Sequence, residues 1–488
     1  MITSTINYSD FNENGCGVKQ IRDIWPILLL LPLISPSSGA AQDICELIVE
    51  CTSPVAALRP LHGVNDGPLH AGGTLNLSDK FREIGVPMTR LHDCHWPVAD
   101  VVDIHVVFPR FAADASDPAS YDFRRTDDYI QSIVDVGSQV VFRLGESIEH
   151  SKRKLHVHPP TDVDQWSAIC LGIVRHYNDG WADGFHHNIR YWEIWNEPEN
   201  RPAMWTGDDE GYYRMYAATA RLLKQHFPAV FVGGPAVGYA GELRGQQLEP
   251  SPFVHEFLAR CRRDALPLDF FSWHSYTNNP WELHDRAHAV RRLLDESGFQ
   301  DAESHLNEWN YLPDNDWSPM MAQVPHARQA WFERLQGSEG AAFTAASFIV
   351  LQDAPLDAAT FYSAATHGFG MFNEYGVPYK NYHAFRAFQQ LLATPSRLRV
   401  NGTLPRGVAL IAATDDHQSR YNILVSNTTA EPHSLSLRLS LSGERHFAIG
   451  LLRLDAQHDL VDEAIDQTVP VKLCLPSASV ALIQISEK

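Results

Sequence analysis

From about residue 58 to residue 390, short apolar runs alternate with longer stretches in which apolar residues recur every three or four positions. The first pattern is typical of buried parallel strands, and the second is typical of helices that cover them. Eight strand candidates separated by helices fit a closed (β/α)8 barrel, which uses about 250 residues. The sequence therefore predicts an α/β protein with a TIM barrel over residues 58–395.

The predicted elements can be given as ranges. One strand is expected near residues 60–64, and the others cover residues 87–91, 139–144, 191–195, 230–233, 269–273, 303–308 and 345–351. Helices are expected over residues 129–136, 162–176, 211–226, 252–263, 282–297 and 327–336.

After Pro395 the pattern changes to short strand-like runs separated by turn residues, which predicts a β-sandwich over residues 396–488. Residues 44–51 (ICELIVEC) have the same strand character, although they precede the barrel. We expect the segment 41–57 to cross over and complete the sandwich. Because the junction near Thr394 is short, the sandwich is expected to pack on the barrel as a structural domain.

The N-terminal segment carries an export pattern. Residues 27–34 (ILLLLPLI) follow the basic residues Lys19 and Arg22 and precede small residues, including Ser38 and Ala40. This order resembles a secretory signal over residues 1–40, and the apolar run is too short to span a membrane. The sequence predicts a secreted or periplasmic protein; the alternative is an apolar N-terminal strand in a cytoplasmic one.

The charge balance excludes some partners. The chain has 39 Lys and Arg against 59 Asp and Glu, a net charge of −20, which repels phosphate backbones and anionic lipid. Neither nucleic acid nor a membrane is therefore expected to bind the mature chain. The seven Cys form no C-x-x-C pair, so no metal or other cofactor is predicted. Nothing in the sequence indicates the oligomeric state.

Two of the predicted strands end in carboxylates beside amide and indole side chains. The fourth continues into Asn196-Glu197-Pro198, and the seventh ends in Asn307-Glu308-Trp309. In TIM barrels the chemistry lies at the carboxyl ends of the strands. One carboxyl can protonate the departing oxygen of an acetal while a second, ~5 to 5.5 Å away, attacks the anomeric carbon. The two Glu therefore predict glycosidic bond cleavage with retention of configuration, with no cofactor.

These residues also resemble a known family. The stretches YWEIWNEPEN (191–200), DFFSWHSYT (269–277), LNEWN (306–310) and HGFGMFNEYGVPYKNYHAF (367–385) are similar to glycoside hydrolase family 39, within the retaining glycosidases of clan A. The resemblance covers about residues 58–395, and it implies a barrel joined to a sandwich. The family's founding activities are β-xylosidase and α-L-iduronidase.

By residue, the resemblance implies Glu197 as general acid/base and Glu308 as nucleophile. Asn196 would contact the sugar 2-hydroxyl, His274 and Tyr276 would orient the sugar and the nucleophile, and Arg90 would pair with Glu308. An acid catalyst needs a raised pKa, so we expect burial and the charge of Glu308 to raise the pKa of Glu197. Arg90 and the Tyr276 hydroxyl are expected to keep Glu308 ionised.

Other residues are weaker candidates. After the first two strands, at least one polar side chain is expected to contact the sugar, from the set His62, Asn65, Asp66, His92, Asp93 and His95. Aromatic residues that could stack on a pyranose are Trp195, Trp273, Trp309 and Phe361.

For further acidic and basic residues the interpretation stays open. Glu146 either orients the site or caps the next helix. Glu193 is expected to act as a buried partner within its strand, and Glu199 as a solvated loop carboxylate. The basic loop residues Lys152, Arg153, Lys154 and His158 either meet a uronate or lie in solvent, and we favour solvent.

The sequence predicts the substrate less precisely than the mechanism. Family β-xylosidases usually carry an aromatic residue, often Trp, on strand eight, whereas residues 347–362 here contain no Trp. Either Phe361, Tyr362 or Phe369 supplies the bulky side chain that a pentose site needs, or the pocket is more open. The predicted function is a retaining exo-glycosidase acting on β-D-xylosides. Alternatives are an α-L-arabinofuranosidase, another exo-glycosidase including an iduronidase-like enzyme, or a catalytically silent carbohydrate-binding protein.

Overall fold

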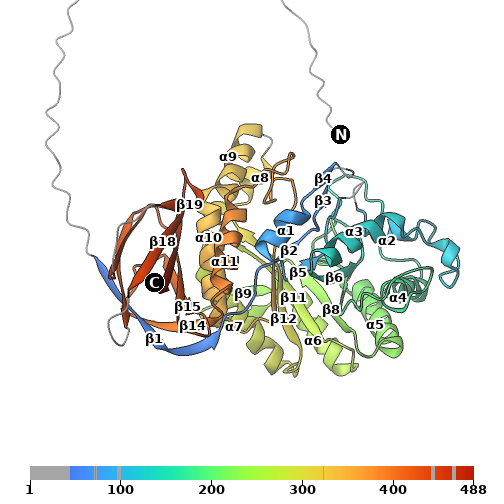
Figure 1. Ribbon diagram of the computed structural model, residues 1–488. Helices are drawn as coiled ribbons and strands as arrows, with labels where there is room; N and C mark the ends of the chain where they lie inside the picture. Colours follow the sequence, from blue (N-terminus) through green and yellow to red (C-terminus); the bar gives the residue numbers. More distant parts are fainter. Residues whose placement is uncertain are drawn as a thin grey trace, which may run out of the picture. The chain divides into compact units, whose positions relative to one another are not determined.

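A closed parallel barrel forms the larger part of the fold (Figure 1). The computed structural model describes residues 44–487 except residues 71, 73, 96–99, 323, 441–445 and 464–468. The predicted secretory signal therefore lies outside the described residues. Around the barrel, the strands follow one another as β2 (Gly63–Asn65), β5 (Met88–Arg90), β6 (Gln139–Leu144), β7 (Tyr191–Ile194), β8 (Phe231–Val237), β11 (Phe270–Thr277), β12 (Glu303–Tyr311) and β13 (Ala358–Phe361).

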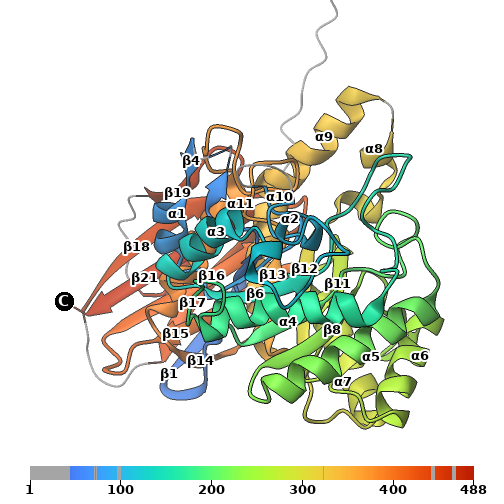
Figure 2. The same cartoon turned by 90° about the vertical axis from the view of Figure 1, so that its right-hand side faces the viewer.

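Helices cover the outside of these strands, and Figure 2 shows α3, α4 and α5 lying across them. Their amphipathic spacing places apolar residues such as Ile130, Ile173 and Leu223 in the core. The helices are α1 (Ser78–Ile84), α2 (Ile104–Val107), α3 (Arg124–Asp135), α4 (Val163–Asp179), α5 (Asp209–His226), α6 (Pro252–Arg263), α7 (Pro280–Glu296), α8 (Ser318–Met321), α9 (Pro325–Gln336), α10 (Ser338–Val350) and α11 (Lys380–Leu392). Two short hairpins, β3 (Leu69–His70) with β4 (Leu75–Asn76) and β9 (Gly241–Arg244) with β10 (Gln247–Pro250), extend the loops.

The prediction of the eighth strand at residues 345–351 was wrong. That segment is helix α10, and the eighth strand is β13, which pairs in parallel with β12 and β2. Residues 340–349 of α10 are all buried, since α10 packs against the barrel on one side and against β15, β16 and β21 on the other. A helix buried all round is apolar all round, so it loses the periodicity that distinguishes it from a strand.

The C-terminal strands and β1 (Cys45–Ala57) form one curled nine-stranded sheet. Its order is β19 (Asp459–Glu463), β18 (Phe447–Leu454), β21 (Ser479–Glu487), β16 (Arg420–Asn427), β15 (Val408–Thr414), β14 (Ser396–Asn401), β1, β17 (His433–Ser440) and β20 (Val471–Leu475). β1 pairs antiparallel with β14 and parallel with β17. The curled sheet encloses its own core, which includes Val49, Ile423 and Leu437.

Helices α10 and α11 lie between the barrel and this sheet (Figure 1). The Ser426 hydroxyl donates to the Ala342 carbonyl of α10 at 2.7 Å, and Asn422 Nδ2 donates to the Gln390 carbonyl of α11 at 2.9 Å. The sheet is therefore joined to the barrel by buried apolar contacts and by hydrogen bonds.

Two further observations concern the described residues as a whole. None of their helices has the length and apolar character needed to cross a bilayer. Among their cysteines, Cys45, Cys94, Cys170, Cys261 and Cys474 are free thiols.

Candidate active site

Two glutamates from opposite sides of the barrel meet at its carboxyl end. Glu308 lies within β12, and Glu197 follows the end of β7 by three residues. The chain leaves β7 with positive φ at Trp195 (71°) and at Glu197 (43°), and the Glu197 N–H donates to the Ala236 carbonyl at 3.0 Å. Such backbone strain costs about 1–3 kcal/mol per residue and is concentrated at functional sites. Here it accompanies the turn that brings the Glu197 carboxyl to the cavity.

The two carboxyls are bridged by a histidine from β11. One oxygen of Glu197, one oxygen of Glu308 and a ring nitrogen of His274 all lie within 4.8 Å of one another. His274 Nδ1 is 2.8 Å from Glu197 Oε1, and His274 Nε2 is 3.4 Å from Glu308 Oε2. The 4.8 Å bound lies below the ~6.5 to 9.5 Å that leaves room for an attacking water, so it favours direct attack by one carboxylate while the other acts as acid.

Each carboxyl has further partners. The Tyr276 hydroxyl donates to Glu308 Oε1 at 2.6 Å, and Asn200 Nδ2 donates to Glu197 Oε2 at 2.8 Å. Gly238 leaves the room that Glu197 needs, because a Cβ at this position would lie 2.4 Å from Glu197 Oε1.

The electrostatics of the pair differ from the expectation for Glu197. Burial raises the pKa of the Glu197 carboxyl, but the hydrogen bond and charge of His274 outweigh burial and hold that pKa below its ordinary value. The pKa of His274 is raised by the two carboxylates against the opposing effect of burial. For Glu308, burial and the charge of Glu197 leave the pKa above its ordinary value in spite of His274, Arg90 and Tyr276. A proton is therefore held at the contact between His274 and Glu197.

Arg90, at the end of β5, organises the base of the site. Its fully buried guanidinium donates to Glu193 Oε2 at 2.7 Å, to Asn196 Oδ1 at 2.5 Å and to Glu308 Oε2 at 3.3 Å. Glu193 also accepts from Asn307 Nδ2 at 2.5 Å, so it ties together β5, β7 and β12. Glu193 is the buried partner that its position within the strand predicts.

Glu193→Gln is expected to destabilise the fold by about 3 kcal/mol, because it removes one partner of a buried ion pair. The measurement is urea unfolding. The matched control is Glu242→Gln, since Glu242 pairs with Arg244 at the surface, where both side chains are 60% or more exposed. That control should change stability by less than about 1 kcal/mol. An equal loss of stability in both variants would show that the buried ion pair stabilises the fold no more than a surface pair does.

The carboxyls open into a cavity of about 890 Å³. Of the residues predicted from sequence, His92, Asp93, His95, Glu197, His274, Tyr276 and Glu308 line it. Asn196 lies just beneath and donates to His92 Nε2 at 3.1 Å, while Asn65 accepts from Arg90 Nη1 at 3.0 Å. These residues were expected to share one site, and the fold brings them together.

Several predicted sugar contacts lie in the core instead. The His62 ring packs between Phe348, Phe385 and Phe388, and its Nε2 lies 3.0 Å from the Gly85 carbonyl. Trp309 and Phe361 are fully buried and pack edge-to-face on each other at 5.3 Å. Trp195 and Trp273 are each 1% exposed. None of these five rings lines the cavity. Trp273, Trp309 and Phe361 lie on strands, where successive residues point alternately to the two faces, and these three point away from the cavity.

The acidic and basic loop residues also differ in placement. Glu199 was expected in solvent, but its Oε2 is buried without a hydrogen-bond partner among the described residues. Burial and the nearby Glu197 raise the pKa of Glu199 to about 7. Of the four basic loop residues, Lys152, Arg153 and His158 are exposed and Lys154 is half-buried, and none of the four lines this cavity. Glu146 turns away to pair with His105.

On the aromatic side of the cavity, sequence reasoning missed Trp317, whereas Tyr362 and Phe369 were expected to supply bulky side chains there. Tyr362 donates to Asp93 Oδ2 at 3.0 Å, and Trp317 packs on Tyr276 at 5.1 Å. Phe369 lies beside both Tyr362 and Trp317. Trp317 follows β12 in an irregular segment, where no periodicity marks a residue as facing a site.

The barrel and the paired carboxyls at its carboxyl end are together the arrangement of an O-glycosyl hydrolase. The family model described as glycosyl hydrolases family 39 matches residues 74–431, so the chain belongs to that family. The resemblance noted in the sequence is thus confirmed.

Individual relatives agree with this membership. A β-xylosidase of Geobacillus stearothermophilus is 27% identical over 265 residues, which cover 49% of this chain and 48% of the relative. The match thus spans about half the length of that protein. A glucosidase structure from Croceicoccus marinus is 27% identical with a TM-score of 0.75, covering 91% of this chain and 99% of the other. A monomeric β-xylosidase structure from Caulobacter crescentus CB15, 17% identical, shares the fold with a TM-score of 0.66 and covers 91% and 99% of the two chains.

Proposed function

We propose that this protein is a retaining exo-glycosidase that uses Glu308 as nucleophile and Glu197 as general acid/base. The observation that carries the proposal is the pair of carboxyl groups, with oxygens within 4.8 Å of each other at the base of an open cavity. A carbohydrate-binding protein without activity would need neither a second carboxylate nor a buried arginine beside it.

In the proposed first step, a Glu308 oxygen attacks the anomeric carbon while Glu197 gives a proton to the departing glycosidic oxygen. The C–O bond breaks, and the sugar is left bound to Glu308 as an ester. In the second step, Glu197 takes a proton from water, the water oxygen attacks the same carbon, and Glu308 leaves. Two displacements restore the original configuration.

The acid step requires a proton on Glu197. His274 holds this proton before the step, in its hydrogen bond with Glu197. Because Nδ1 and Oε1 are 2.8 Å apart, the proton moves along a single hydrogen bond between imidazolium and carboxylic acid. As negative charge leaves Glu308 during its attack, the imidazolium loses a stabilising neighbour. Transfer of the proton to Glu197 is thereby favoured at the moment when the leaving oxygen needs it.

The pH profile of kcat/KM is expected to be bell-shaped, with both limbs displaced upward. Glu308 must be ionised, and since its pKa is raised, activity falls on acidification at a pH above the ordinary glutamate pKa of about 4.3. The His274 and Glu197 pair must keep its proton, and since the pKa of His274 is raised, activity persists past the ordinary histidine value of about 6.5. In His274→Gln the basic limb should move to lower pH, because only Glu197 then holds the proton. An unchanged basic limb would contradict the role given to His274.

The proposed substrate follows from the relatives. The proposed glycone is β-D-xylose, because the relatives from Geobacillus stearothermophilus and Caldicellulosiruptor saccharolyticus are β-xylosidases. A second candidate is a glucoside, favoured by the Croceicoccus marinus glucosidase, which matches nearly over its full length.

A panel of nitrophenyl glycosides tests the proposal, with xylosides, glucosides, arabinofuranosides, galactosides and uronides side by side. The highest kcat/KM is expected on the β-xyloside. A higher kcat/KM on the glucoside would make glucose the glycone and would not affect the proposed mechanism. Absence of turnover on the whole panel, together with sugar binding, would instead support the carbohydrate-binding alternative.

A further inference from the structure

A second cavity, of about 560 Å³, opens beside β6 on the other side of the loop that follows this strand. Loop residues Ile148 and His150 line the first cavity, whereas Leu155 and His156 line the second. Leu155 is 56% exposed at its mouth. The volume lies in the range of small-molecule sites, about 300–1,000 Å³.

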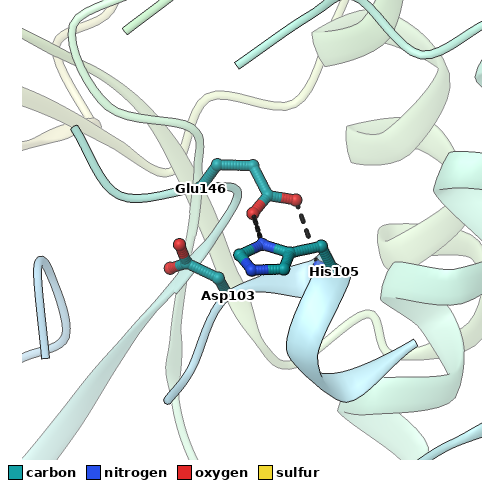
Figure 3. Close-up of side chains that lie close together, drawn as sticks. All are labelled: Asp103, His105 and Glu146. Atoms are coloured by element: carbon teal, nitrogen blue, oxygen red, sulfur yellow. Dashed lines mark hydrogen bonds and ion pairs between the residues drawn. The ribbon is translucent and has the colours of Figure 1, made fainter. Parts of the chain in front are cut away.

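Aromatic side chains and one carboxylate are among the residues that line this cavity. Phe108, Phe111, Trp166 and Trp195 line it together with three prolines, and Glu146 is the one carboxylate among the described residues of the lining. Glu146 is 6% exposed, and its Oε2 lies 2.5 Å from His105 Nδ1 (Figure 3). No Lys or Arg is among the described residues that line this cavity.

Glu146 is paired with His105, which contacts both of its oxygens: Oε1 accepts from the His105 N–H at 3.2 Å, and Oε2 lies 2.5 Å from Nδ1. The nearby guanidinium of Arg143 is taken by Asp103, which also accepts from the Ser147 N–H and hydroxyl at 2.6 and 2.9 Å. Burial, the larger cause, and the charge of Asp103 raise the pKa of Glu146 to about 7. Its local counter-charge is thus only a proton shared with His105.

We propose that this cavity binds a small organic cation, an alkylammonium group with its charge against Glu146 and its carbon atoms against the aromatic walls. Aromatic faces attract such cations, and a buried carboxylate whose counter-charge is a proton shared with His105 gains a permanent counter-charge when a cation enters. The other polar residues of the lining are His105, His156, His158 and Thr161, and a quaternary ammonium needs no hydrogen bond from them. This site is independent of the proposed glycosidase activity.

A metal ion is a poorer fit, although Asp103, His105 and Glu146 offer ligand atoms within 4.8 Å of one another. Two ligands of a tetrahedral zinc ion lie about 3.3 Å apart, because each is about 2.0 Å from the metal. The His105 and Glu146 atoms are 2.5 Å apart, as in a hydrogen bond. Figure 3 shows the Asp103 carboxylate separate from this pair, and both its oxygens are already engaged.

The test is calorimetric titration of the full chain with choline, tetramethylammonium and 3,3-dimethyl-1-butanol, the neutral isostere of choline. We expect saturable binding of both cations and at least about tenfold weaker binding of the alcohol. Titration in buffers of different ionisation enthalpy should show proton release on binding, because the ligand replaces the proton shared by Glu146 and His105.

Two variants locate the site. Glu146→Gln, which removes the charge and keeps the size, and Phe111→Ala, which keeps the charge and removes one wall, should each weaken choline binding about tenfold. The control Glu242→Gln should bind as the parent does. The proposal is overturned by equal binding of choline and its isostere, by no saturation with either cation, or by binding that both variants retain. Zn²⁺ binding in place of the cations, lost in His105→Ala, would make the cluster a metal site.

Discussion

Replacing Glu308 by Ala is expected to lower kcat by about 10⁵-fold on every glycoside that the parent cleaves, since a covalent enzyme without its nucleophile retains only binding and polarisation. The space left by the missing carboxyl should admit azide. Azide would then attack the anomeric carbon once and give a glycosyl azide of inverted configuration. Turnover of a nitrophenyl glycoside, with and without azide, measures both effects.

Two variants separate this loss from misfolding. Glu308→Gln keeps the size of the side chain and should be as inactive as Glu308→Ala. The matched control is Glu303→Ala, on the same strand but at its opposite end, where the side chain accepts hydrogen bonds from Arg190 and Tyr191. It should leave kcat close to that of the parent. Near-normal activity in Glu308→Gln would remove Glu308 from the nucleophile role.

Replacing Glu197 by Ala should produce a loss that depends on the leaving group. Alkyl glycosides need a proton on the departing oxygen, so their kcat should fall by about 10³-fold. Dinitrophenyl glycosides leave without protonation, so their first step should be nearly unaffected while the second step slows. A burst of dinitrophenol followed by slow turnover is the expected kinetic trace.

Glu199→Gln is the matched control for this experiment, because Glu199 lies two residues further along and has a raised pKa. It should keep the leaving-group dependence of the parent. If Glu199→Gln, and not Glu197→Ala, lost activity selectively on alkyl glycosides, Glu199 would be the acid catalyst.

Most of the fold could be predicted from the sequence because the barrel repeats one pattern, a buried strand followed by a helix. Seven of its eight strands overlap their predicted ranges, and residues 139–144 match β6 completely. The eighth was misplaced because α10, buried between barrel and sheet, has no polar face to reveal its helical period. The burial of a segment between two domains depends on the tertiary structure, so the local sequence pattern does not show it.

For the site, the sequence predicted those residues whose type the reaction requires. It did not predict which side chains face the cavity and which face the core, because packing in the folded chain decides that. Glu197, Glu308, His274 and Tyr276 converge because strand ends meet at one face of a barrel. Trp309 and Phe361 carry equally suggestive side chains, yet the pleat of β12 and β13 turns them into the core. The lowered pKa of Glu197 arises from a 2.8 Å contact with a residue 77 positions away, a distance that only the folded chain defines.

The configuration of the first sugar released tests the proposed double displacement most directly. Proton NMR can record it before mutarotation equilibrates the two anomers. Carboxyl oxygens of Glu197 and Glu308 within 4.8 Å of each other predict retention, so a β-glycoside should first yield the β-anomer of the free sugar. An α-anomer as the first product would mean a single displacement by water. That result would contradict the assignment of Glu308 as a nucleophile.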